Sequence, residues 1–241
     1  MITLEVVYLC RSTGVNRNDI FFASRFYSSF LRQKDIDSSI QLSLCVLIKG
    51  SNSNHLKSFF DQHNVLSVEI PDFGFDIDSY FRFASSATCD LMLPMSFTSY
   101  FTSPTSIRRL SFPFVLHKYQ IESIPIISFS LYSFSSHRKP LRSLPLIYKR
   151  LHYIYSLRFI VLYLRGLFHF SDFPNMPNFH IRTTGFLIST SNYKAFFNSP
   201  FPPFTKYDCY QFESGFRSFT RYLQDGFRLY LADTPMHRPP S

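Results

Sequence analysis

The run SIQLSLCVLIK, residues Ser39–Lys49, decides the fold class. This run is rich in β-branched and other apolar residues, and it is followed by Gly50 and Ser51, which are typical of turns. The segments on either side, Ile20–Leu31 and Asn52–Asn64, instead repeat apolar residues at helical spacing. A strand with apolar residues on both faces, lying between two helices, is typical of a parallel sheet.

The same alternation continues outward in both directions. Further strands are expected at Thr3–Leu9, Val65–Ile70 and Cys89–Leu93, and a third helix at Asp78–Ala87. Asn18 or Asp19 is expected to cap the first helix. The first 95 residues therefore predict the order β-α-β-α-β-α-β. Because short crossovers join apolar strands, the sequence favours an α/β fold with a mostly parallel sheet and helices on both faces.

The rest of the chain carries weaker periodicity. The expected elements are strands at Ile124–Tyr132, His180–Ser189 and Phe227–Ala232, a helix at Tyr207–Gly226, and a basic amphipathic helix within 138–170. Thr98–Tyr119 is expected to be helical only in part, since Pro104 and Pro113 break it. The prediction is one domain over 1–241, with a first half at 1–96, a second half at 97–233 and a frayed tail at 234–241.

Charge is distributed unevenly along the chain. Residues 1–90 hold eight Lys/Arg against ten Asp/Glu, whereas residues 91–241 hold 17 against six. The second part alone is strongly basic, which indicates an anionic partner such as a nucleotide diphosphate, a nucleic acid or an anionic membrane surface.

The four cysteines are widely spaced and form no CxxC pair, so free thiols in a reducing compartment are expected, and a zinc site is not. The start of the chain does not read as a signal peptide, and Arg158 and Arg165 interrupt the most apolar long stretch, Leu151–Phe170. The expected location is the cytoplasm, with the inner face of a membrane as the alternative site of action.

Carboxylates gather directly after the third expected strand. Asp72, Asp76 and Asp78 lie within PDFGFDID, residues 71–78. Ligands of open α/β sheets bind at the carboxyl ends of strands, so these side chains are candidates for ribose, sugar or metal binding. The alternative is helix capping, in which Asp76 or Asp78 offsets the dipole at a helix N-terminus.

Two later segments carry further candidate groups. His180 and Arg182 alternate along an expected strand and point to one side, where a guanidinium suits a diphosphate or carboxylate; an exposed strand edge is the alternative. Glu213 and Arg217 lie four residues apart on an expected helix. Such a pair is either a surface ion pair or a carboxylate base directed into a cleft.

Together and in this order, these segments resemble a group of bacterial-type glycosyltransferase-like proteins related to glycosyltransferase family 2, some of them associated with rhamnan or O-antigen synthesis. PDFGFDI at 71–77 and FESGFRSFT at 212–220 are the most specific parts. Weaker matches are IKG at 48–50, LPMS at 93–96 and PNFHIRTTGF at 177–186.

The resemblance implies a GT-A (Rossmann-like) fold in which a nucleotide-sugar lies across the carboxyl edge of the first strands. Residues 1–96 would then be the nucleotide-binding half and residues 97–233 the acceptor half. The implied reaction transfers a glycosyl group to a hydroxyl of a glycan or lipid-linked acceptor. It implies that Glu213 is the catalytic base and that Arg182 contacts phosphate or orients the acceptor. Asp72 and Asp76 would line the donor pocket, and the remaining donor- or substrate-binding candidates are Ser96, His180 and Arg217.

The implied metal has no ligand in the expected place. Metal-dependent GT-A enzymes hold Mg²⁺ or Mn²⁺ with an Asp-x-Asp-like motif after the fourth strand, and here that position reads Pro94-Met95-Ser96. The basic run at 138–165 could supply the missing positive charge, or could hold the domain to an anionic membrane. Mg²⁺ or Mn²⁺ is the cofactor that the resemblance suggests, but the usual Asp-x-Asp position for it is lost.

Two alternatives to the enzyme remain. One is a catalytically weakened relative that binds glycan or scaffolds a biosynthetic complex. The other is a basic module that binds nucleic acid or a membrane surface. Carboxylates at the sheet edge disfavour nucleic acid, because they repel phosphate.

Overall fold

The computed structural model describes residues 1–50, 52–72 and 75–117, together with the short segments 126–128, 131–132, 180–181, 185–196 and 229–231. The chain divides into two compact units. The first comprises Met1–Phe129, Thr183–Phe204 and Phe227–Ser241, and the second Ser130–Arg182 and Thr205–Gly226. The prediction of one domain, with a nucleotide-binding half at 1–96 and an acceptor half at 97–233, stays a prediction.

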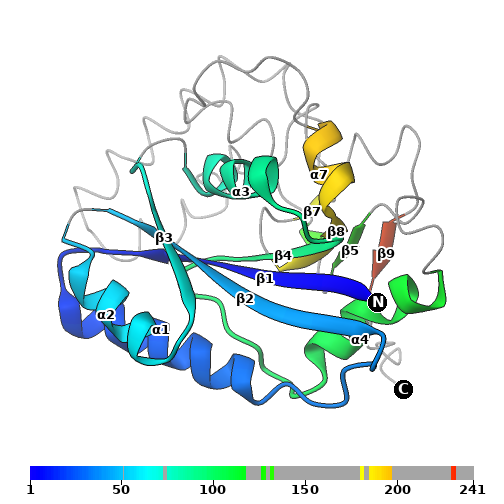
Figure 1. Ribbon diagram of the computed structural model, residues 1–241, viewed down its shortest axis with the longest axis horizontal. Helices are drawn as coiled ribbons and strands as arrows, with labels where there is room; N and C mark the ends of the chain where they lie inside the picture. Colours follow the sequence, from blue (N-terminus) through cyan, green and yellow to red (C-terminus); the bar gives the residue numbers. More distant parts are fainter. Residues whose placement is uncertain are drawn as a thin grey trace, which may run out of the picture. The chain divides into compact units, whose positions relative to one another are not determined.

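The first 95 residues form the predicted alternation of strands and helices (Figure 1). The elements are β1 (Ile2–Arg11), α1 (Asn16–Leu31), β2 (Ile40–Lys49), α2 (Asn54–Gln62), β3 (Leu66–Ile70), α3 (Phe75–Ser86) and β4 (Leu91–Met95). The four strands are parallel and lie in the order β3-β2-β1-β4. This confirms the predicted α/β class, with a mostly parallel sheet.

The sheet of the first unit continues beyond β4 to seven strands in the order β3-β2-β1-β4-β8-β5-β9. The added elements of this unit are α4 (Ser106–Leu116), β5 (Ile126–Ser128), β8 (Phe186–Ser189), α7 (Thr190–Phe196) and β9 (Leu229–Leu231). Strand β8 is antiparallel to both β4 and β5, and β9 is parallel to β5. Strand β9 confirms a strand within Phe227–Ala232, whereas the predicted helices at Tyr207–Gly226 and within 138–170 lie outside the described residues.

Two predicted strands are each divided in two, which corrects the sequence interpretation. Ile124–Tyr132 contains β5 and β6 (Leu131–Tyr132), while His180–Ser189 contains β7 (His180–Ile181) and β8. Strands β5 and β8 pair in the large sheet, and β6 and β7 pair antiparallel in the second unit. Gly185, just before β8, has φ +77° and donates its N–H to the Pro94 carbonyl (2.7 Å). This left-handed conformation ends an extended run at low cost only for glycine.

Helices cover both faces of the sheet (Figure 1): α1, α2 and α4 lie on one side, and α3 and α7 on the other. Alternate residues of β1 supply the two cores, as the pleat requires. Leu4, Val6 and Tyr8 belong to the cluster that includes Phe26 of α1, Phe60 of α2 and Leu110 of α4. The ring of Tyr8 stacks on Phe26 with centroids 3.7 Å apart, which fastens α1 to the middle of the sheet.

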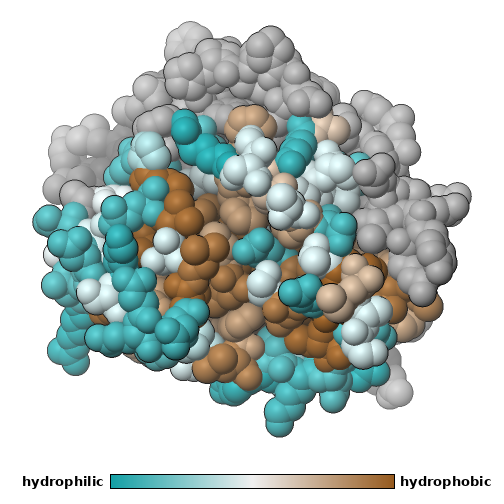
Figure 2. Space-filling model, in the orientation of Figure 1, coloured by the Kyte–Doolittle hydropathy of each residue, from teal (hydrophilic) through white to brown (hydrophobic). Residues whose placement is uncertain are grey.

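Strand β3 is the exposed edge next to β2. Its side chains Leu66 and Val68 are 63% and 42% exposed, and Figure 2 shows hydrophobic surface over this strand. The prediction that strands are apolar on both faces therefore describes β1, β2 and β4, whereas β3 is half covered at best.

Helix α4 corrects the expectation that Pro113 breaks the segment Thr98–Tyr119. The helix begins after Pro104, as expected, but it continues through Pro113 to Leu116. A proline inside a helix removes one backbone hydrogen bond. The buried side chains Ile107, Leu110 and Phe114 flank the proline on the core side, and their burial offsets that loss.

Within the described segments, no helix is both long and apolar enough to cross a bilayer.

The described thiols are free, as predicted. Cys10 and Cys45 are buried and Cys89 is half-buried, whereas Cys209 lies outside the described residues. Burial raises the pKa of the Cys45 thiol to about 12, and the charges of Glu5 and Cys89 act in the same direction.

Alkaline pH is expected to destabilise the fold through these thiols. An unfolded thiol ionises near its ordinary pKa of 9.0, while Cys45 stays protonated to about 12. The folded state therefore binds more protons over this interval, and the free energy of unfolding falls as pH rises from 9 towards 12. Cys45→Ala should reduce that slope by up to about 1.4 kcal/mol per pH unit relative to the unsubstituted chain. Urea denaturation of both proteins between those pH values checks this, and identical slopes would contradict it.

Candidate functional site

The carboxyl ends of β1, β2 and β3 lie in register at one edge of the sheet. Arg11 of β1 is the register partner of Lys49 of β2, and Lys49 is in turn the partner of Ile70 of β3. The loops that follow these residues therefore begin side by side. This is the edge of an open α/β sheet at which ligands bind, and the predicted residues Asp72 and Asp76 lie directly beyond it.

Asp72 lies in the loop after β3, where the sequence placed it. Its carboxylate faces the guanidinium of Arg11 at 3.5 Å, and both side chains are about half exposed. Such an exposed pair contributes little to stability. A ligand at this edge could therefore contact both the guanidinium at the end of β1 and the carboxylate in the loop after β3.

Lys49 is a buried cation behind this pair, and its importance was missed in the sequence, where it was only part of the IKG match. Its side chain is 3% exposed, and its Nζ lies 3.4 Å from the Ser79 hydroxyl of α3. Burial lowers the pKa of Lys49, while the charges of Asp72, Asp76 and Asp78 oppose that shift. The signal in the sequence was a lysine at the end of an apolar strand, since such a residue rarely enters a core without partners.

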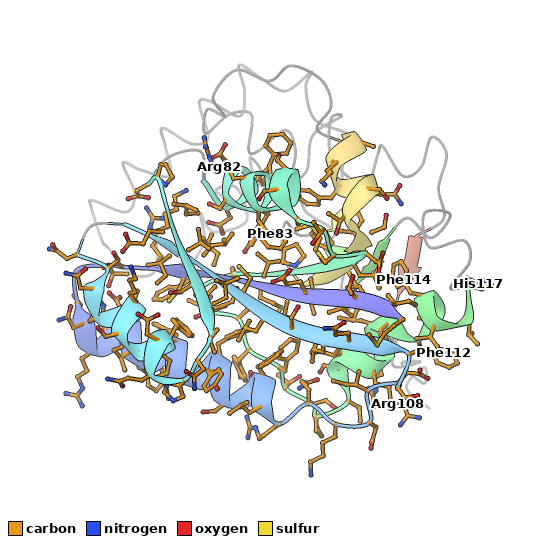
Figure 3. All side chains as sticks on the ribbon, in the orientation of Figure 1. Arg82, Phe83, Arg108, Phe112, Phe114 and His117 are labelled. Carbon is orange, nitrogen blue, oxygen red and sulfur yellow. The ribbon has the colours of Figure 1, made fainter. Side chains whose placement is uncertain are left out.

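Asp76 and Asp78 occupy the first turn of α3, where the helix dipole stabilises negatively charged side chains. Asp78 is 6% exposed and accepts a hydrogen bond from Nε of Arg82 (2.7 Å) one turn later. Figure 3 shows Arg82 on the side of α3 turned away from the sheet. Arg11, Lys49 and Arg82 thus match the three carboxylates in number, and the cluster is close to neutral.

Gly50 allows the first two loops to approach each other closely. It has φ +111°, and a Cβ there would lie 2.6 Å from the Ser12 carbonyl oxygen. The Ser12 N–H donates to the Lys49 carbonyl (2.7 Å), which extends the β1–β2 ladder by one residue. Any side chain at position 50 would push these loops apart, so the glycine is required by the edge itself.

The loop after β1 is held by a buried carboxylate, Asp19, which corrects the predicted helix cap. Helix α1 begins at Asn16, and no side chain caps it. Asp19 is 0% exposed and accepts hydrogen bonds from the Thr13 N–H (3.0 Å) and the Thr13 hydroxyl (2.6 Å). Its Oδ2 also lies 3.1 Å from Nε2 of His55 on α2. Asp19 therefore fixes the first loop of the candidate site.

Ser96 lies immediately after β4, at the position where an Asp-x-Asp motif was expected. Its hydroxyl lies 2.7 Å from the Ser99 hydroxyl, and the Tyr8 hydroxyl donates to the Phe97 carbonyl (2.7 Å) in the same turn. Within the described part of the chain, no three His, Cys, Asp or Glu side chains come together as a metal site. The donor set after β4 is made of hydroxyls and does not fit Mg²⁺ or Mn²⁺, which prefer carboxylate oxygens.

For the other predicted site residues, the structure gives no position relative to this edge. Glu213, Arg217 and Arg182 lie outside the described residues. His180 begins β7 in the second unit, where it is the register partner of Tyr132. The roles given to these four residues stay predictions.

Solved structures with a similar fold include two with a TM-score of 0.50. One is a nucleotidyl transferase from Methanothermobacter thermautotroptrophicus, at 10% identity over 96% of this chain and 88% of its own. The other is 4-diphosphocytidyl-2C-methyl-D-erythritol synthase from Anaerococcus prevotii, at 10% identity over 95% of this chain and 86% of its own. The fold is α/β and Rossmann-like, with a mostly parallel sheet.

A glycosyltransferase is also among the similar structures. Glucosyl-3-phosphoglycerate synthase from Mycobacterium tuberculosis, solved in complex with uridine diphosphate, aligns with all of this chain and 73% of its own, at 12% identity and a TM-score of 0.48. No family model matches the chain, and no curated protein matches it in sequence. At these identities the likeness shows the fold alone.

Proposed function

We propose that the chain binds a nucleotide-sugar at the carboxyl edge of β1–β3 and transfers its glycosyl group to a hydroxyl of a glycan or lipid-linked acceptor. The observation that carries the proposal is that Arg11, Lys49 and Asp72 lie together where three neighbouring strands end. A diphosphate needs cations and a ribose needs carboxylate acceptors, and this edge offers both. The chain is then a divergent relative of the family 2 and rhamnan-synthesis-related enzymes that its motifs resemble.

In this proposal the described residues bind and position the donor. Arg11 is exposed and can contact the diphosphate directly, while Asp72 accepts from sugar or ribose hydroxyls once the ligand separates it from Arg11. Lys49 is too deeply buried to touch the donor and acts as a positioning residue, since its charge offsets the carboxylates around it. Glu213 is the proposed base that takes the acceptor proton, with Arg182, Arg217 and His180 as further binding groups. No step is assigned to a metal.

The hydroxyl set after β4 favours one second candidate, a catalytically weakened relative that binds the donor or a glycan without turnover. The two differ in the outcome of the Glu213→Gln substitution. An enzyme loses turnover and keeps donor binding, whereas a binding protein shows no turnover to lose. Both act in the cytoplasm in this proposal, where the free thiols of the fold stay reduced.

Thermal unfolding with UDP-, GDP- and dTDP-sugars, each with Mn²⁺ or with a chelator, tests the binding step. A ligand that binds only the folded state raises the melting temperature by mass action. We expect one nucleotide class to raise it with the chelator present. If no donor shifts the melting temperature under either condition, the proposal is wrong.

Lys49→Met is expected to weaken donor binding about tenfold, while Lys49→Arg retains most of it. Loss of this charge leaves the carboxylates of the cluster in excess, which repels a diphosphate by roughly 1–2 kcal/mol at an effective dielectric constant near 20. Isothermal titration with the donor found above measures the change. Lys57→Met, on the exposed face of α2, is the matched control and should bind as the unsubstituted chain does. Equal weakening by Lys49→Met and Lys49→Arg would show a packing role instead.

A further inference from the structure

Helix α4 carries apolar and basic side chains on the face that it turns away from the core. Ser106, Ile107, Leu110, Ser111 and Phe114 are buried. The opposite face consists of Arg108, Arg109, Phe112 and Leu116, which fall within an arc of about 100° at 3.6 residues per turn. We call these four residues the α4 stripe. Figure 3 shows Phe114 on the sheet side of α4, with Arg108 and Phe112 on the other side.

The exposure of the α4 stripe is large for its apolar members. Phe112 is 56% exposed and Leu116 63%, and the Arg108 side chain is 57% exposed. The whole of α4 contains no acidic residue. The solvent-facing side of a surface helix is ordinarily polar. A face that combines Phe and Leu with two arginines therefore indicates an interaction surface.

More positive charge lies beside the stripe, at the end of α1. The Lys34 N–H donates to the Pro104 carbonyl (2.7 Å), and the Ile107 N–H donates to Oε1 of Gln33 (3.1 Å), so the two helix ends are joined. Arg32 and Lys34 are exposed on this segment. Asp35 and Asp37 are also exposed there, and Asp35 lies 3.7 Å from Arg108. Four basic side chains, two on each helix end, therefore face two acidic ones, and the local charge is positive.

We propose that the α4 stripe docks on an anionic lipid bilayer. The headgroup layer offers anions to the arginines and an apolar layer beneath them to Phe112 and Leu116, which is the combination that interfacial helices use. Nucleic acid would leave Leu116 without a partner, and a second copy of the stripe would place like charges against each other. The surface is separate from the candidate site, because α4 begins beside the end of α1, at the amino ends of the strands.

A single introduced tryptophan tests the docking surface directly, because the full chain contains no Trp. Phe112→Trp should shift its fluorescence emission to the blue when vesicles of phosphatidylcholine and phosphatidylserine are added. It should not shift with phosphatidylcholine alone, and high salt should reverse the effect. Phe21→Trp is the matched control, since Phe21 is 58% exposed on α1, and its emission should not change.

Vesicle co-sedimentation separates this surface from other basic parts of the chain. Arg108→Gln with Arg109→Gln should weaken binding to the anionic vesicles by roughly fivefold for each arginine. Arg17→Gln with Lys57→Gln removes the same charge from other exposed positions and should weaken it much less. Vesicle binding that is absent in the unsubstituted chain, or that is insensitive to the arginine substitutions, overturns the proposal. The proposal is also wrong if the arginine substitutions abolish binding to RNA, or self-association of the chain, and leave lipid binding unchanged.

Discussion

Replacing Phe26 by alanine is expected to lower the free energy of unfolding by about 3–5 kcal/mol, the usual range for a large aromatic side chain removed from a core. Phe26 is 0% exposed and stacks on Tyr8 in the middle of β1. Its ring also lies 6.1 Å from that of Phe101, in the segment that leads to α4. The cavity would therefore open where α1, the sheet and the connection to α4 meet.

Phe21→Ala is the control for this prediction. Phe21 lies on the same helix but is 58% exposed, so its loss should change the free energy of unfolding by less than about 1 kcal/mol. Urea denaturation of the three proteins, followed by circular dichroism, measures the difference. Similar losses for Phe21→Ala and Phe26→Ala would mean that α1 does not pack on the sheet through the face described.

Asp19→Ala is expected to cost about 2–4 kcal/mol, because it removes a buried acceptor and leaves its donors without partners. Those donors are the N–H and hydroxyl of Thr13 and the imidazole of His55. Since Thr13 belongs to the loop after β1, we also expect weaker donor binding at the candidate site. Asp19→Asn keeps one oxygen acceptor and should lose less stability than Asp19→Ala.

Denaturation and donor titration are measured together for these variants. Asp35→Ala is the control, because its side chain is 64% exposed and pairs with Arg108 only at the surface. It should leave both stability and donor binding nearly unchanged. If Asp19→Ala unfolds no more easily than Asp35→Ala, the buried network around Thr13 does not hold the loop.

The order of strands and helices through β4 could be predicted from the sequence, because it depends on local periodicity. Apolar runs such as Ser39–Lys49 and helical spacings such as that of α1 need no knowledge of distant partners. The same locality places Asp72 and Asp76 at the sheet edge, since a residue that directly follows a parallel strand must lie at its carboxyl end. The parallel direction followed from the helical crossovers.

Only the tertiary structure decided which polar groups are buried and which helices and strands continue. Lys49 is buried because α3 covers the end of β2, and Asp19 is paired because α2 brings His55 to it from 36 positions along the chain. Helix α4 passes through Pro113 because its core contacts outweigh one lost hydrogen bond, and the Gly185 N–H just before β8 reaches the carbonyl of Pro94 on β4. Each of these outcomes depends on contacts between segments far apart in the chain, and such contacts leave no periodic signal in the sequence.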